Sequence, residues 1–152
     1  MKFKIILLFI LFSLNLAAQT NYKALILPST LSLLSGATWG LHEATSHHWN
    51  AFNAKFPHCN GQFWNPEISW RNKYIQGNPD LGRKKFLGVN TPVQFTDAKH
   101  LLATSNQVFG FAAGISITIG KKVGWKQYAL RIGSSFVAYS LGNYLTYNIL
   151  TQ

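Results

Sequence analysis

Residues 24–41 read ALILPSTLSLLSGATWGL and contain no Asp, Glu, Lys, Arg or His. Two later stretches share this property: LLATSNQVFGFAAGISITIG at residues 101–120 and IGSSFVAYSLGNYLTYNILTQ at residues 132–152. A helix of about 20 residues spans the hydrocarbon layer of a bilayer, which is about 30 Å thick. Each uncharged stretch is close to that length. The sequence therefore predicts an all-α fold, a small membrane-embedded bundle of about three long helices.

Small residues recur at every fourth position of these stretches. The sets are Ser32, Gly36 and Gly40; Gly110 and Gly114; and Ser134, Ala138 and Gly142. Such spacing places each set on one helix face, where neighbouring backbones approach closely. Two alternatives stay open. The helices are buried in a soluble periplasmic protein, or residues 114–120 (GISITIG), which alternate apolar and hydroxyl side chains, form a strand.

The composition of the chain agrees with a membrane setting. Its 152 residues suit one domain, and only 12% are charged, about half the usual share in soluble domains. Fourteen Lys and Arg against four Asp and Glu give a formal net charge of +10, which suits anionic, phosphate-bearing partners. The chain has one cysteine, Cys59, so it forms no internal disulfide and no cysteine-based zinc knuckle.

The N-terminal residues 1–18, MKFKIILLFILFSLNLAA, have the pattern of a secretory signal peptide. Lys2 and Lys4 precede a short apolar core, and Ala17 and Ala18 offer a cleavage site. Leu16 stands where a small residue is preferred, so an uncleaved anchor is the alternative. The mature protein is then a single helical domain over residues 19–152.

The domain is expected to contain four parts. They are a first helix at 24–56, a basic and aromatic loop region at 57–91, a second helix at 92–120 and a third at 127–150. Pro57 ends the first helix, because the residue before a proline disfavours helical geometry. Thr91 or Thr96 caps the second helix, with Pro92 near its start.

Histidine and acidic residues gather at two helix ends. LHEATSHHW, residues 41–49, places Glu43 and His47 four residues apart, and TDAKH places Asp97 and His100 one turn apart. If the two helices are neighbours, a ligand set for zinc or iron forms from Glu43, His47, His48, Asp97 and His100. The string at residues 41–49 is not the HExxH motif of zinc proteases, because His42 and His47 are five residues apart and not four. Alternatively, these side chains are solvated or paired with one another.

A second string, FWNPEISWRNKY at residues 63–74, interleaves aromatic and basic residues. Aromatic rings favour the membrane interface and cations favour lipid phosphates. The residues expected to bind a headgroup or partner are Trp64, Trp70, Arg71 and Lys73. In the alternative, the loop packs its rings on the bundle and pairs Glu67 with Arg71.

The strings HEATSHHW, FWNPEISWRNKY and FTDAKHLL together resemble a family of short, uncharacterised bacterial membrane proteins. The resemblance covers most of the mature chain and implies the membrane architecture, but no activity. The expected location is a bacterial membrane, the inner membrane first, with the periplasm as the alternative. The expected partners are anionic lipids, another membrane protein or a second copy of the chain, and not nucleic acid. A metal-dependent membrane hydrolase or oxidase acting on a lipid-like substrate is the alternative function.

Overall fold

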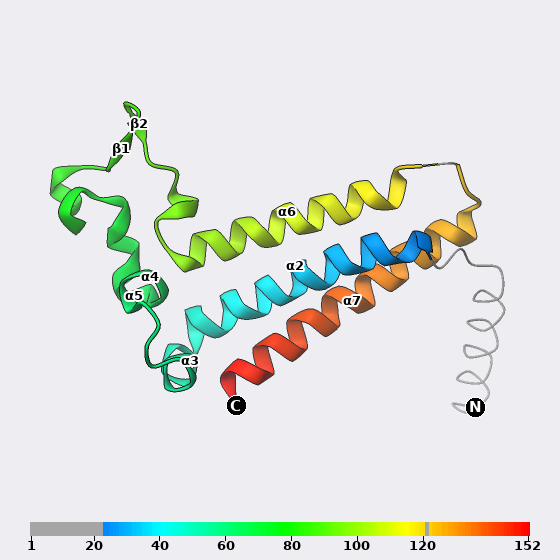
Figure 1. Ribbon diagram of the computed structural model, residues 1–152, viewed down its shortest axis with the longest axis horizontal. Coiled ribbons are helices and arrows are strands. Elements are labelled where there is room, and N and C mark those ends of the chain that lie inside the picture. The colour runs from blue at the N-terminus through cyan, green and yellow to red at the C-terminus, as the bar shows by residue number, and fades with distance from the viewer. Residues whose placement is uncertain (1–22, 121) are drawn as a thin grey trace.

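The computed structural model describes residues 23–120 and 122–152, and it is predominantly helical (Figure 1). Three long helices run side by side, and a head of short elements stands at one end of them (Figure 1). The all-α prediction is thus confirmed. The expected signal peptide, residues 1–18, lies outside the described residues.

The elements follow one another along the chain in a simple order. They are α2 (Lys23–His47), α3 (Trp49–Lys55), α4 (Gly61–Trp64), α5 (Pro66–Ser69), η1 (Trp70–Lys73), η2 (Ile75–Gly77), η3 (Pro79–Leu81), β1 (Lys85–Phe86), β2 (Val89–Asn90), η4 (Val93–Phe95), α6 (Ala98–Thr118) and α7 (Trp125–Thr151). At about 1.5 Å per residue, each of the long helices α2, α6 and α7 is at least 30 Å long.

Helix α2 lies between α6 and α7, which contact each other little (Figure 1). It runs parallel to α7 and antiparallel to α6 (Figure 1). The parallel pair is joined through glycines. A Cβ on Gly40 would lie 2.6 Å from the Asn143 carbonyl oxygen, and Cβ atoms on Gly36 and Gly142 would clash with the backbone of the facing helix. The predicted small-residue faces of the first and third stretches therefore form the α2–α7 contact.

The α2–α6 contact is polar at its centre. The Ser35 hydroxyl donates to the Asn106 carbonyl at 3.0 Å, and the Asn106 amide donates to the Ser35 carbonyl at 2.8 Å. Gly110 lies against Ser35, whereas a Cβ on Gly114 would meet no atom of the described chain within 4 Å. Thus only the first glycine of the predicted α6 pair lies against a neighbouring helix.

Burial in the long helices is inverted relative to a water-soluble bundle. The buried residues are mostly small or polar, among them Ser32, Ser35, His42, Thr45, Arg131 and Ser135. Large apolar side chains point outward instead; Phe111 is 73% exposed and Phe136 71%.

Among the described helices, α2 alone is both long and apolar enough to cross a membrane by length and composition. The core helix of a soluble protein passes the same test, so this criterion by itself does not separate the two settings.

The helix boundaries differ most from the expected ones in the first helix and at the start of the second. The first helix is broken at His48, where φ is −130° and ψ 41°, and α3 ends at Lys55, two residues before Pro57. The second begins only at Ala98, because the carboxylate of Asp97, and not Thr91 or Thr96, caps it. Residues 114–118 are helical, so the alternative of a strand at 114–120 was wrong.

The head, residues 48–97, is held together by a few polar contacts between its own residues. The Asn72 amide donates to the carbonyls of Gln62 and Thr96, at 2.7 and 2.8 Å. Beyond it, β1 and β2 form a two-stranded hairpin that stands out to the side, past the start of α6 (Figure 1). Its turn is Leu87–Gly88, with φ of 49° and 82°, the positive values that tight hairpins require.

Candidate functional site

The polar end of the bundle carries most of the candidate residues, and the first group lies at the end of α2. A Glu43 carboxylate oxygen is 3.3 Å from Nδ1 of His42, and the other oxygen is 3.7 Å from Nε2 of His47. His42 is buried and stacks on Trp39, with ring centroids 4.7 Å apart. The predicted pairing of Glu43 with His47 is present, but His42 is the closer partner.

Asp97 and His100 form a second pair, at the start of α6. Asp97 is 1% exposed, and its carboxylate accepts from the backbone N–H of His100 at 2.9 Å and from the Thr96 hydroxyl at 3.2 Å. The His100 Nδ1 lies 2.8 Å from both carboxylate oxygens. Both oxygens of the Asp97 carboxylate therefore already have partners, and the main role of this side chain is to cap α6.

His48 belongs to neither pair. It occupies the break between α2 and α3, and its Nε2 lies 2.7 Å from the hydroxyl of Tyr147 on α7. Between the α2–α3 junction and the start of α5, a polar pocket of about 390 Å³ is lined in part by His47, His48 and Glu67. Glu67 was not among the residues expected here, because it lies in the distant 63–74 string.

The five expected metal ligands do not assemble into one centre. Within residues 23–120 and 122–152, no three His, Cys, Asp or Glu side chains are grouped to hold a metal ion. The predicted zinc or iron site is therefore not supported. Its expected ligands instead make separate contacts: Glu43 with His47, Asp97 with His100, and His48 with Tyr147. The pair Asp97–His100 is a local contact, because residues three apart lie next to each other on a helix.

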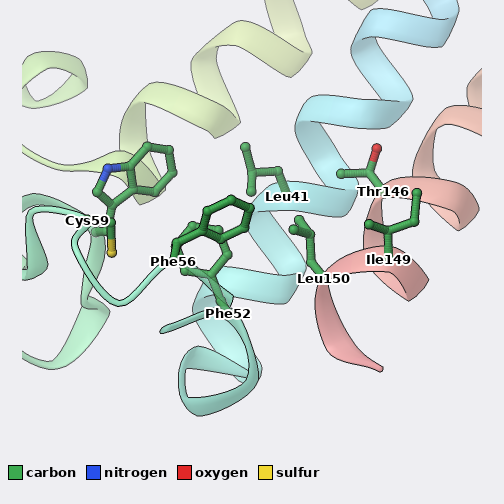
Figure 2. Close-up of a pocket in the computed structure, with 8 residues that line it drawn as sticks. Leu41, Phe52, Phe56, Cys59, Thr146, Ile149 and Leu150 are labelled. Carbon is green, nitrogen blue, oxygen red and sulfur yellow. The ribbon is translucent and has the colours of Figure 1, made fainter. Parts of the chain in front are cut away.

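A second, apolar pocket lies where α2, α3, α4 and α7 meet. Its volume is about 540 Å³, and its lining consists of Leu41, Phe52, Phe56, Cys59, Trp64, Thr146, Ile149 and Leu150. Figure 2 shows Leu41 on α2, Phe52 on α3, Phe56 just after the end of α3, and the α7 residues on the facing side. The ring centroids of Phe52 and Trp64 lie 5.5 Å apart with the rings tilted by 30°, so α4 packs against α3 at this wall. Trp64 is thus a pocket residue, apart from the other expected headgroup residues.

The other headgroup candidates form a basic, aromatic surface on the head. The Arg71 guanidinium lies 5.3 Å from the Trp70 ring centroid, and the Lys73 ammonium lies 5.3 Å from that of Tyr74. The described residues contain no Glu67–Arg71 ion pair; Glu67 instead receives the Trp70 indole N–H on its carbonyl, at 3.0 Å. The two cations are therefore free of carboxylate partners in the described chain.

Backbone pairing brings the hairpin to the same surface. Tyr74 and Arg83 form an antiparallel bridge, and the Lys84 N–H donates to the Lys73 carbonyl at 2.9 Å. This joins two strings that are separate in the sequence. We call the result the basic surface; it comprises Arg71, Lys73, Arg83, Lys84 and Lys85.

Comparison of the chain with protein-family models, curated proteins and solved structures finds no match. The resemblance to short bacterial membrane proteins stays an expectation from the sequence strings. The functional argument therefore depends on the geometry of this chain alone.

Two polar groups important to the bundle were missed at the sequence level. Neither Asn106 nor Arg131 was among the residues that the sequence pattern selected. Arg131 is 7% exposed, and its guanidinium donates to the Ile117 carbonyl at 2.8 Å, near the end of α6. Arg131 is the sole charged residue of the expected third helix, residues 127–150, and this isolation was the available signal.

Proposed function

We propose that this chain is a small integral membrane protein whose three long helices lie in the bilayer and whose head lies on its surface. The observation that carries the proposal is the inverted burial. Phe111, Phe136 and Ile149 are among the large side chains exposed on the long helices, while serines, glycines and Arg131 lie inside. Such a surface is stable where the surroundings are hydrocarbon.

The interior supports the same proposal, because several of its polar groups bond between helices. Ser29 on α2 donates to Ser134 on α7 at 3.1 Å, and Ser35 exchanges bonds with Asn106 on α6. Small residues and interhelical hydrogen bonds hold helices together where the hydrophobic effect gives no drive for association.

The head is proposed to bind anionic lipid headgroups without catalysing a reaction. The basic surface carries five cations, and the hairpin beside it exposes apolar side chains; Leu87 at its tip is 88% exposed. Cations bind lipid phosphates, while apolar side chains enter the boundary between headgroups and acyl chains. The hairpin stands to the side of the bundle (Figure 1), which suits contact with the adjacent bilayer surface.

Alkaline carbonate extraction of membranes from cells that make the full chain tests the membrane placement. The expected result is that the protein stays in the membrane pellet, because its apolar helix surfaces would otherwise face water. Release into the soluble fraction would overturn the proposal.

The head contact is tested with an environment-sensitive fluorophore on Leu87→Cys in a Cys59→Ser background, in lipid nanodiscs. Emission is expected to shift to the blue when phosphatidylglycerol replaces phosphatidylcholine. Salt should reverse the shift, since screening shortens from about 10 Å at 0.1 M to about 3 Å at 1 M. The pair Lys84→Gln with Lys85→Gln should reduce it. The matched pair Lys122→Gln with Lys126→Gln, at the opposite end of the bundle, should not. An emission indifferent to lipid charge contradicts the head contact.

A further inference from the structure

The apolar pocket between α2, α3, α4 and α7 is open to the surface and is larger than packing requires. Its volume of about 540 Å³ is within the range of pockets that bind one small molecule. Two of its lining residues are themselves well exposed: Ile149 at 63% and Phe56 at 46%. An occupant therefore enters from the outer side of α7, the side that faces lipid if the proposed function is right.

The lining selects a hydrocarbon occupant. Leu41, Phe52, Phe56, Ile149 and Leu150 present only carbon, and the remaining heteroatoms are the Thr146 hydroxyl, the Cys59 thiol and the Trp64 indole nitrogen. A peptide segment would bring amide groups into this space, and few partners exist for them. Each amide buried without a hydrogen bond costs free energy. An acyl chain has no such groups.

The rim selects the charge of the headgroup. Lys55, adjoining the lining residue Phe56, places its ammonium 2.6 Å from the carbonyl of Ile149, at the edge of the pocket. That carbonyl is a neutral partner, so the ammonium keeps its charge available. None of the eight lining residues described is acidic. A negatively charged group at this edge would meet a cation and no carboxylate from the lining.

We propose that this pocket binds one acyl chain of an anionic phospholipid from the surrounding bilayer, with the lipid phosphate at Lys55. The proposal depends on the membrane placement argued above and names the lipid class that the chain holds. Figure 2 shows Phe52 and Phe56 on one side of the pocket and the α7 side chains on the other; the acyl chain would lie between them.

Trp64 in the pocket wall supplies a direct readout. The full chain is reconstituted in phosphatidylcholine nanodiscs that contain a small, fixed fraction of a brominated lipid. The brominated lipid is either phosphatidylglycerol or phosphatidylcholine, and in both the bromine is in the middle of the acyl chain. Bromine quenches tryptophan on contact. The share of Trp64 is the difference between the parent and Trp64→Phe, because the chain has four other tryptophans. We expect brominated phosphatidylglycerol to quench Trp64 more than brominated phosphatidylcholine does.

Three variants make the test specific. Lys55→Gln should remove the preference for phosphatidylglycerol, a change of about fivefold in relative affinity if one basic residue near the surface contributes about 1 kcal/mol. Thr146→Phe, which fills the pocket, should abolish quenching by both lipids. Leu145→Phe, on the next residue of α7 but outside the pocket lining, should leave both unchanged.

Two results would overturn the inference while the protein remains in the nanodisc. The first is that Trp64→Phe loses no lipid-dependent quenching, which means that no acyl chain reaches the pocket. The second is equal quenching by the two lipids, which removes the anionic headgroup. Failure of the parent chain to enter nanodiscs at all counts against the proposed membrane placement instead.

Discussion

Substitution of Gly40 by alanine tests the α2–α7 contact on which the bundle depends. The new Cβ would lie 2.6 Å from the Asn143 carbonyl oxygen and 3.1 Å from the Tyr147 nitrogen, whereas ordinary contact begins at 3.4 Å. The facing backbone must therefore retreat by about 0.8 Å, the difference between 3.4 and 2.6 Å. Both neighbours are backbone atoms, so no side-chain rotation relieves the clash.

Overpacking of this kind costs about 1–3 kcal/mol. Alanine also favours a helix over glycine by about 1 kcal/mol, which offsets part of the loss. The net expectation is a destabilisation of up to about 2 kcal/mol. Gly133→Ala is the matched control, because a Cβ there meets no atom of the described chain within 4 Å and only the helix-propensity gain applies.

The free energy of unfolding in detergent, followed by circular dichroism across a denaturant titration, measures both variants. Gly40→Ala is expected to unfold at lower denaturant than the parent, and Gly133→Ala at equal or higher denaturant. If Gly40→Ala is as stable as Gly133→Ala, then the backbones of α2 and α7 are not in contact and the packing argument is refuted.

Two further predictions use the same unfolding assay. Asp97→Ala should lower the free energy of unfolding by about 0.5–2 kcal/mol through loss of the α6 cap. Asp97→Asn keeps a hydrogen-bond acceptor and should lower it less. Equal losses in the two variants would mean that the charge of this side chain matters and not its capping bond. Asn106→Leu should cost about 1 kcal/mol, since bonds between membrane helices average about 0.6 kcal/mol. That cost should shrink in a Ser35→Ala background, and full additivity would contradict a direct contact.

The long helices and one of their contacts were predictable because the responsible signals are local. Absence of charge over about 20 residues indicates a long helix, and spacing of four residues defines a face. That reasoning found Gly36, Gly40 and Gly142. It also selected Gly114, which has no close neighbour in the described chain, because spacing specifies a face but not its partner.

The candidate sites were less predictable, because they depend on how helices are rotated about their axes. The pairs Glu43–His47 and Asp97–His100 follow from residues on one helix turn, and both are present. A shared metal centre would need both pairs to face one point, which spacing does not encode. The apolar pocket combines Leu41 with Leu150, residues joined only by the three-dimensional fold.

The parallel pairing of α2 and α7 also has a consequence for synthesis of the chain. Ser29 and Ser134, which bond across this pair, are 105 residues apart. At about 5–20 residues per second, α2 waits roughly 5–20 s before α7 exists. During that interval the glycine face of α2 has no permanent partner. Assembly is therefore completed by the last helix to be made, and truncation within α7 would leave the glycine face of α2 exposed to contact with other proteins.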